Sequence, residues 1–128
     1  MGQVTHYVST KPKARKRHFC DLCNRVIQPG EEYRRSAGMD GSTAWTWREC
    51  AHCAQLIAVV WRETYSDDGY DSMTVDDWEP RTIAALRVKV LWRRKWARAD
   101  GSLHPVPVVT WLEDKYGFGH PVDVAIAS

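Results

Sequence analysis

The chain contains four cysteines, and their spacing constrains its fold more than any other feature. They form two C-x-x-C pairs, Cys20 with Cys23 and Cys50 with Cys53. Thiolates at this spacing project from one tight turn onto the same metal ion, and two such turns complete a tetrahedral zinc site. The pattern therefore predicts one structural Zn²⁺ ion. Disulfide or redox chemistry and an iron–sulfur cluster are the alternatives.

The N-terminal residues and the apolar segments indicate the cellular localisation that we expect for the chain. The first residues, MGQVTHYVSTKPKARKR, lack the apolar segment of a signal peptide. The longest purely apolar stretch, residues 56–61, is too short to cross a membrane. We therefore expect a cytoplasmic protein without a membrane partner, whose thiols are reduced and able to bind metal.

Charge is strongly segregated along the chain, although the formal net charge is only +2. Residues 80–98 carry seven Lys/Arg and no acid, residues 65–79 carry six Asp/Glu and no base, and residues 11–17 carry five basic side chains. Four thiolates and one zinc ion would contribute about −2 and offset the formal excess. Any affinity for polyanions must therefore come from local patches.

Turn signals lie between the two cysteine pairs. Asn24 tolerates the left-handed backbone that a tight metal-binding turn needs. In the Ile27-Gln28-Pro29-Gly30 segment, Pro29 and Gly30 suit the second and third positions of a type II turn. Residues 31–39 and 42–48 flank Asp40-Gly41, a strong signal for a two-residue β-hairpin loop. That loop predicts three cross-strand pairs: Tyr33 with Arg48, Arg34 with Trp47, and Ser36 with Trp45.

The second cysteine pair leads into a predicted helix over residues 51–65, AHCAQLIAVVWRETY, of about four turns. Ligands at the start of a helix benefit from its N-terminal amides and dipole, which favour thiolate over thiol.

This order of knuckle, hairpin and helix resembles that of treble-clef zinc fingers. The motifs C-x-x-C-x-x-x-I-x-P-G-E-x-Y and W-x-x-C-x-x-C, within residues 19–56, are similar to the LIM-type and PARP-type versions. In those versions the third ligand is commonly a histidine, at the position of Cys50 here. The resemblance covers less than a third of the chain and implies fold and zinc, not activity. The residue usage is also similar to that of small zinc-finger proteins of actinobacteria and their phages, which implies a host-modulating role.

Other metal sites and catalytic centres fit the sequence less well than this four-cysteine site. His18 and His52 are rival zinc ligands, but four thiolates already suffice. An HNH nuclease needs a histidine base with a further His or Asn, and residues 32–48 contain neither. A RING domain needs about eight ligands. We expect no catalytic residue, no enzyme activity and no small-molecule substrate.

The sequence also contains an acidic cluster with two possible interpretations, a binding site for a hard cation or a solvated loop. The residues lack EF-hand spacing, and this favours the solvated loop. The cluster comprises Asp67, Asp68, Asp71, Asp76 and Asp77.

The predicted organisation is an α+β fold in one compact chain. It has a basic N-terminal arm over residues 1–17, the zinc module over 18–65, and a helical extension over 66–128 that begins with a loop at 66–73. Residues 80–99 predict a helix, with a strand as the competing interpretation. One face of that helix would carry Ile83, Leu86, Val90 and Ala97. Residues 108–117 predict a short helix closed by Gly117, and residues 120–128 carry no clear signal.

Two binding functions are compatible with these patches. In the first, a nucleic-acid-binding regulator neutralises phosphates through basic side chains. These are Lys11, Lys13, Arg15, Lys16, Arg17, Arg34, Arg35, Arg93, Arg94, Lys95 and Arg98. In the second, a protein-interaction module uses zinc as a scaffold and tryptophans as anchors for a host protein. These are Trp45, Trp47, Trp92 and Trp96. Trp92 and Trp96 are alternatively core residues.

Overall fold

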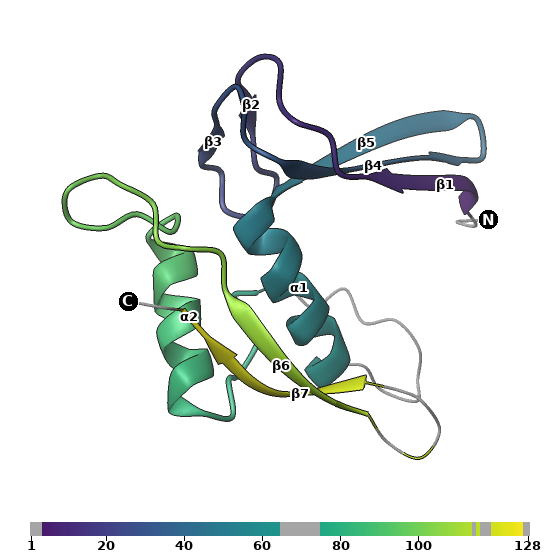
Figure 1. Ribbon diagram of the computed structural model, residues 1–128. Helices are drawn as coiled ribbons and strands as arrows, with labels where there is room; N and C mark the ends of the chain where they lie inside the picture. Colours follow the sequence, from purple (N-terminus) through teal and green to yellow (C-terminus); the bar gives the residue numbers. More distant parts are fainter. Residues whose placement is uncertain (1–3, 65–74, 114, 116–118, 127–128) are drawn as a thin grey trace. The chain divides into compact units, whose positions relative to one another are not determined.

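The computed structural model describes residues 4–64, 75–113, 115 and 119–126 (Figure 1). Within them the chain is a mixed α and β protein with two helices, α1 and α2, and seven strands, β1 to β7. The predicted α+β class is therefore confirmed. The chain divides into two compact units, Met1–Ala54 and Gln55–Ser128, and the division falls inside α1 (Ala51–Thr64).

The N-terminal unit contains an antiparallel sheet with the strand order β1-β4-β5. Its edge strand β1 (Val4–Thr10) pairs with β4 (Tyr33–Asp40). The basic arm expected over residues 1–17 is therefore a strand over part of its length. The reason is local, because V-T-H-Y-V-S-T is rich in β-branched and aromatic residues that favour extended backbone. The prediction followed the charges of residues 11–17 and overlooked this preference.

The hairpin of β4 and β5 (Thr43–Cys50) exists, but its predicted register is wrong by two residues. Asp40 pairs with Thr43, so the loop consists of Gly41 and Ser42. Gly41 takes the first loop position with a φ of 63°, as a type II′ turn requires. A shift of two residues leaves every side chain on its predicted face. The three predicted pairs become Tyr33 with Cys50, Arg34 with Glu49, and Ser36 with Trp47.

Two short strands, β2 (His18–Phe19) and β3 (Val26–Ile27), enclose the first cysteine pair. Asn24 between them has a φ of 65°, which confirms the predicted left-handed turn. The next predicted turn is confirmed as well. Gly30 has a φ of 91°, and the Glu31 amide donates to the Gln28 carbonyl at 3.1 Å.

The helix predicted over residues 51–65 is confirmed as α1, and its Leu56, Val59 and Val60 are fully buried. No helix in the described part of the chain is long and apolar enough to span a membrane. The loop predicted over residues 66–73 lies outside the described residues, as do Asp67, Asp68 and Asp71 of the acidic cluster.

Residues 80–99 contain a helix rather than a strand, but α2 is shorter than predicted and covers Ile83–Arg93. It begins after Thr82, whose Oγ1 accepts a hydrogen bond from the Ala85 amide at 3.1 Å. It ends in a Schellman motif, in which the Trp96 amide donates to the Leu91 carbonyl and the Lys95 amide to that of Trp92.

The early end of α2 has an energetic reason. Lys95 and Trp96 adopt φ angles of 57° and 63°, which cost about 1–2 kcal/mol each. The turn leaves the Trp96 side chain fully buried. Burying an aromatic ring of this size is worth about 4–6 kcal/mol, which offsets the strain.

On the apolar face predicted for this helix, Ile83, Leu86 and Val90 are exposed. Ala97 lies beyond the end of the helix. Helix α2 contacts β7 (Gly119–Ala125). The buried residues of α2 are Ala85, Val88 and Lys89.

The short helix predicted over residues 108–117 is wrong. Residues 108–113 form β6 (Val108–Glu113), which pairs with β7 in an antiparallel hairpin. The β-branched run Val108, Val109, Thr110 favours a strand once a partner is present, and that partner lies in the segment for which the sequence carried no signal. The C-terminal extension is therefore mixed rather than helical.

Candidate metal centre

The first two cysteines are positioned by the tight turn between β2 and β3. The Asn24 amide donates to the Cys20 carbonyl and the Cys20 amide to the Arg25 carbonyl, both at 2.9 Å. These bonds and the left-handed Asn24 close the loop so that both thiols face the interior. Cys20 and Cys23 are buried.

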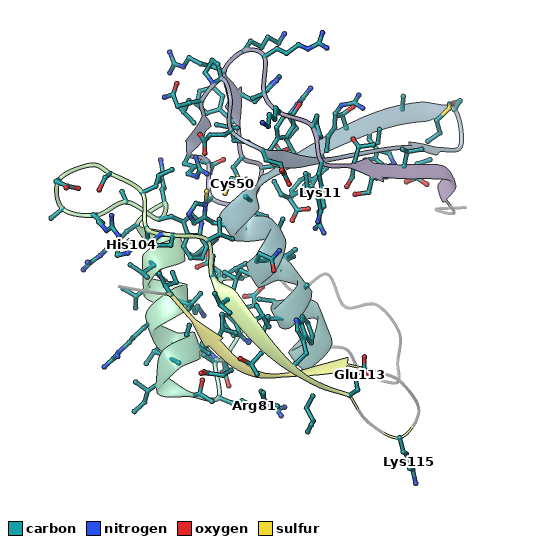
Figure 2. All side chains as sticks on the ribbon, in the orientation of Figure 1. Lys11, Cys50, Arg81, His104, Glu113 and Lys115 are labelled. Carbon is teal, nitrogen blue, oxygen red and sulfur yellow. The ribbon has the colours of Figure 1, made fainter. Side chains whose placement is uncertain are left out.

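The other two cysteines come from the junction of β5 and α1, where Figure 2 labels Cys50. Cys50 is the last residue of β5, and Cys53 lies in the first turn of α1. The knuckle is tied to this junction by two backbone interactions. The Asp21 amide donates to the Arg48 carbonyl at 2.8 Å, and the Arg48 amide donates to Asp21 Oδ2 at 2.7 Å.

The four sulfur atoms form a compact cluster. All lie within 4.8 Å of one another, and the Cys23 and Cys50 Sγ atoms are 4.0 Å apart. Zn–S bonds of about 2.3 Å in a tetrahedron imply sulfur–sulfur distances of about 3.8 Å. A disulfide would need about 2.05 Å, and none of these four cysteines forms one. The sequence prediction that these four residues come together is confirmed.

Hydrogen bonding and charge distinguish the thiols from one another. The Cys50 amide donates to Cys20 Sγ at 3.3 Å. Hydrogen bonds from Cys23, Cys50 and Cys53 lower the pKa of Cys20. Interaction with Cys20 raises the pKa of Cys50 and of Cys53. Four buried thiols this close cannot all ionise side by side, so the cluster favours a divalent cation at its centre.

A buried arginine, which is not among the residues predicted from the sequence, lies beside the cluster. Arg25 is only 6% exposed and forms two hydrogen bonds with Glu31, at 3.2 and 2.9 Å. Burial disfavours its charge, but these bonds and the nearby charge of Cys50 raise the pKa of Arg25 overall. A fixed cation beside four thiolates compensates part of their excess negative charge. Two features of the sequence could have indicated this ion pair: Arg25 lies two residues after Cys23, and an acid, Glu31, follows the Pro29-Gly30 turn directly.

The two candidate histidines lie outside the cluster of possible ligands. His52 is buried, and its Nδ1 lies 3.4 Å from Arg25 Nη2. Because a guanidinium has no acceptor, Nδ1 is the acceptor in this contact. His18 stacks obliquely on Tyr33, with ring centroids 5.3 Å apart. Burial, followed by the charges of Arg48 and Lys16, lowers the pKa of His18.

The basic residues predicted to bind nucleic acid fall into both units. In the N-terminal unit, Arg34 forms an ion pair with the buried carboxylate of Glu49, whereas Arg35 is exposed. Also exposed there are Lys11, Lys13, Arg15, Lys16 and Arg17. Exposed residues of the C-terminal unit are Arg93, Arg94, Lys95 and Arg98.

The predicted tryptophan anchors differ in exposure. Trp47 is 40% exposed and Trp45 is half-buried. Trp92 is half-buried, and its Nε1 is buried without a hydrogen-bond partner among the described residues. Trp96 is fully buried and presents no surface to a partner.

In the part of the chain that the structure describes, the cysteines form a group able to hold a metal ion, and neither Asp76 nor Asp77 belongs to such a group. No protein-family model, curated protein sequence or solved structure matches this chain.

Proposed function

We propose that the N-terminal unit is a treble-clef zinc module with one structural Zn²⁺ ion bound by Cys20, Cys23, Cys50 and Cys53. The support is the order of elements, because a knuckle between β2 and β3, the β4–β5 hairpin and α1 follow one another as in that fold. Four thiolates in a tetrahedral arrangement suit zinc and leave no coordination position for a substrate. The metal therefore acts as a scaffold, and the module is not an enzyme.

We further propose that this module binds nucleic acid through the basic loop, defined as residues 11–17. The observation that carries the proposal is that backbone hydrogen bonds hold this loop to the residues around the Pro29-Gly30 turn. Ala14 is buried, its amide donates to the Glu31 carbonyl, and its carbonyl accepts from the Gly30 amide, both at 2.8 Å. The backbone that carries five exposed cations is thereby held in place, which lowers the entropic cost of bringing them together on phosphates.

Two neighbouring features favour an anionic partner. Arg35 lies directly opposite Arg48 on β4 and β5, and like charges in this position repel each other. A phosphate at this pair would relieve the repulsion. Phe19 is 65% exposed close after the basic loop and offers a ring on which an unpaired base can stack.

The test is the salt dependence of binding to fluorescein-labelled single- and double-stranded oligonucleotides, measured by fluorescence anisotropy. Changing all five cations of the basic loop to Gln should weaken binding at least about tenfold. It should also reduce the slope of log K against log salt by about 0.7–0.9 for each lost phosphate contact.

A matched control removes the same number of exposed charges from the C-terminal unit. It changes Arg87, Arg93, Arg94, Lys95 and Arg98 to Gln. We expect the control to bind like the unmodified chain. Salt-independent binding or no binding contradicts the function, and a larger loss in the control than in the loop variant contradicts the assignment to the basic loop.

A further inference from the structure

Helix α2 has two apolar sides, of which only one is buried. Ala85 and Val88 lie on the buried side, and α2 contacts β7. Ile83, Leu86 and Val90 follow each other at helical spacing and are 72%, 51% and 37% exposed. In Figure 2, side chains of α2 on the side away from β6 and β7 project into solvent. Contiguous exposed apolar side chains are a feature of interaction surfaces.

This exposed side is hollowed into a groove, called the α2 groove here. It has a volume of about 490 Å³. Its walls are the side chains of Ile83, Leu86, Arg87, Val90 and Leu91. Among the described residues its lining comes from α2 alone, so it presents an elongated apolar surface rather than the enclosing walls of a ligand pocket. It has room for apolar side chains presented by another polypeptide, as in helix-in-groove recognition.

The charged side chains of α2 itself are all positive. Helix α2 contains no acidic residue, Arg87 lines the groove, and Arg94 lies seven residues further along the same side. Lys89 does not contribute, because its Nζ points to the buried side and donates to the backbone carbonyls of Asp76 and Trp78. The segment that carries Asp76 is thereby held at the buried side of α2.

This charge discriminates between occupants. A second copy of this chain, packed on the α2 groove by two-fold symmetry, would bring its own Arg87 and Arg94 close to those of the first copy. Like charges juxtaposed at an interface are costly. Acidic side chains beside apolar anchors would complement both the groove and its rim.

We propose that the α2 groove is a docking site for an amphipathic helical segment of another protein, whose apolar anchors are flanked by Asp or Glu. This site lies in the C-terminal unit and is independent of the basic loop proposed to bind nucleic acid.

The test begins with a phage-displayed library of random peptides about 16 residues long, roughly four helical turns. The library is selected on the zinc-loaded full chain and counter-selected on its Leu86→Glu variant. The proposal predicts enriched peptides with apolar residues at i, i+3 or i+4, and i+7 and an excess of Asp and Glu. Failure to enrich such peptides, or enrichment of basic ones, overturns it.

An enriched peptide is then synthesised and its Kd measured by anisotropy. Leu86→Glu and Arg87→Glu should each weaken binding about tenfold or more. The matched control Leu112→Glu, at a residue 61% exposed on β6, should change Kd less than about twofold. Equal losses in Leu86→Glu and Leu112→Glu contradict the proposal. If Leu86→Glu lowers the melting temperature, Ile83→Ser replaces it and must show the same loss.

Two further probes distinguish other classes of partner. Vesicles containing phosphatidylserine and a labelled oligonucleotide are offered to the unmodified chain and to Leu86→Glu. The proposal predicts that Leu86→Glu leaves both interactions unchanged. Leu86-dependent binding of vesicles identifies a membrane surface, and Leu86-dependent binding of the oligonucleotide identifies a nucleic-acid surface. Either result overturns the peptide assignment.

Discussion

Nη2 of Arg25 lies 2.9 Å from Oε1 of Glu31, and this ion pair joins the first cysteine turn to the start of the hairpin. Oε2 of the same carboxylate accepts from the Gln28 amide at 2.6 Å. Glu31 therefore ties the Pro29-Gly30 turn to Arg25, the cation that lies beside the four thiols. Because Arg25 is almost fully buried, loss of Glu31 would remove the carboxylate that accepts two of its hydrogen bonds.

Glu31→Gln should lower the free energy of unfolding at pH 7 by about 1–3 kcal/mol, because Arg25 stays buried without its anionic partner. The measurement is urea unfolding of the zinc-loaded protein, followed by circular dichroism. The control is Glu32→Gln at the exposed neighbouring residue, which should change stability by less than about 0.5 kcal/mol. Equal effects of the two substitutions would show that the ion pair contributes nothing.

The contribution of Glu31 should depend on pH in a defined direction. Burial alone would raise the pKa of Glu31, but hydrogen bonds from Arg25 and the Gln28 amide bring it below its ordinary value of 4.5. The stabilisation is therefore complete above about pH 4.5 and is lost as pH falls through the lower pKa of the folded state. The difference between unmodified protein and Glu31→Gln should be constant from pH 7 to about 5 and shrink below it, in saturating zinc. A difference that grows toward acid contradicts the assigned pKa direction.

Removal of zinc should unfold the N-terminal unit, because its short strands β2 and β3 bury little apolar surface without the metal. Elemental analysis should find one zinc per chain. After chelation, hydrogen exchange should accelerate in residues 18–50 and remain slow in α2. The Cys20→Ser, Cys23→Ser double variant should behave like the chelated protein. Native circular dichroism in that variant would refute a structural role for zinc.

Lys89 should stabilise the C-terminal unit through hydrogen bonds rather than exposed charge. Its Nζ donates to the Asp76 carbonyl at 2.9 Å and also to the Trp78 carbonyl, and the side chain is 7% exposed. Lys89→Met keeps the bulk of the side chain but leaves both carbonyls without this donor. We expect a loss of about 1–3 kcal/mol in unfolding free energy. Arg87→Met, at an exposed position on the same helix, is the control and should change stability by less than about 0.5 kcal/mol.

Much of the metal centre could be predicted because its determinants are local. The C-x-x-C spacing, the tolerance of Asn24 for a positive φ, and the Pro29-Gly30 turn each act within a few residues. The same holds for α1, whose apolar periodicity is continuous. Hairpin register failed by two residues because Asp40-Gly41 and Gly41-Ser42 both form acceptable loops, and pairing along the whole strand selects between them.

The sequence by itself determined the cluster of four thiols, because ligand spacing and backbone sterics need no distant partner. Tertiary structure alone decided that Arg25 is buried beside it, since burial of a charge requires Glu31 to reach it across a turn. It also decided that residues 108–113 form a strand, because an isolated β-branched run has no structure until β7 supplies its hydrogen bonds. It decided, finally, which apolar side of α2 is covered, because packing covers only one side of this helix: Ala85 and Val88 are buried, whereas Leu86 stays exposed.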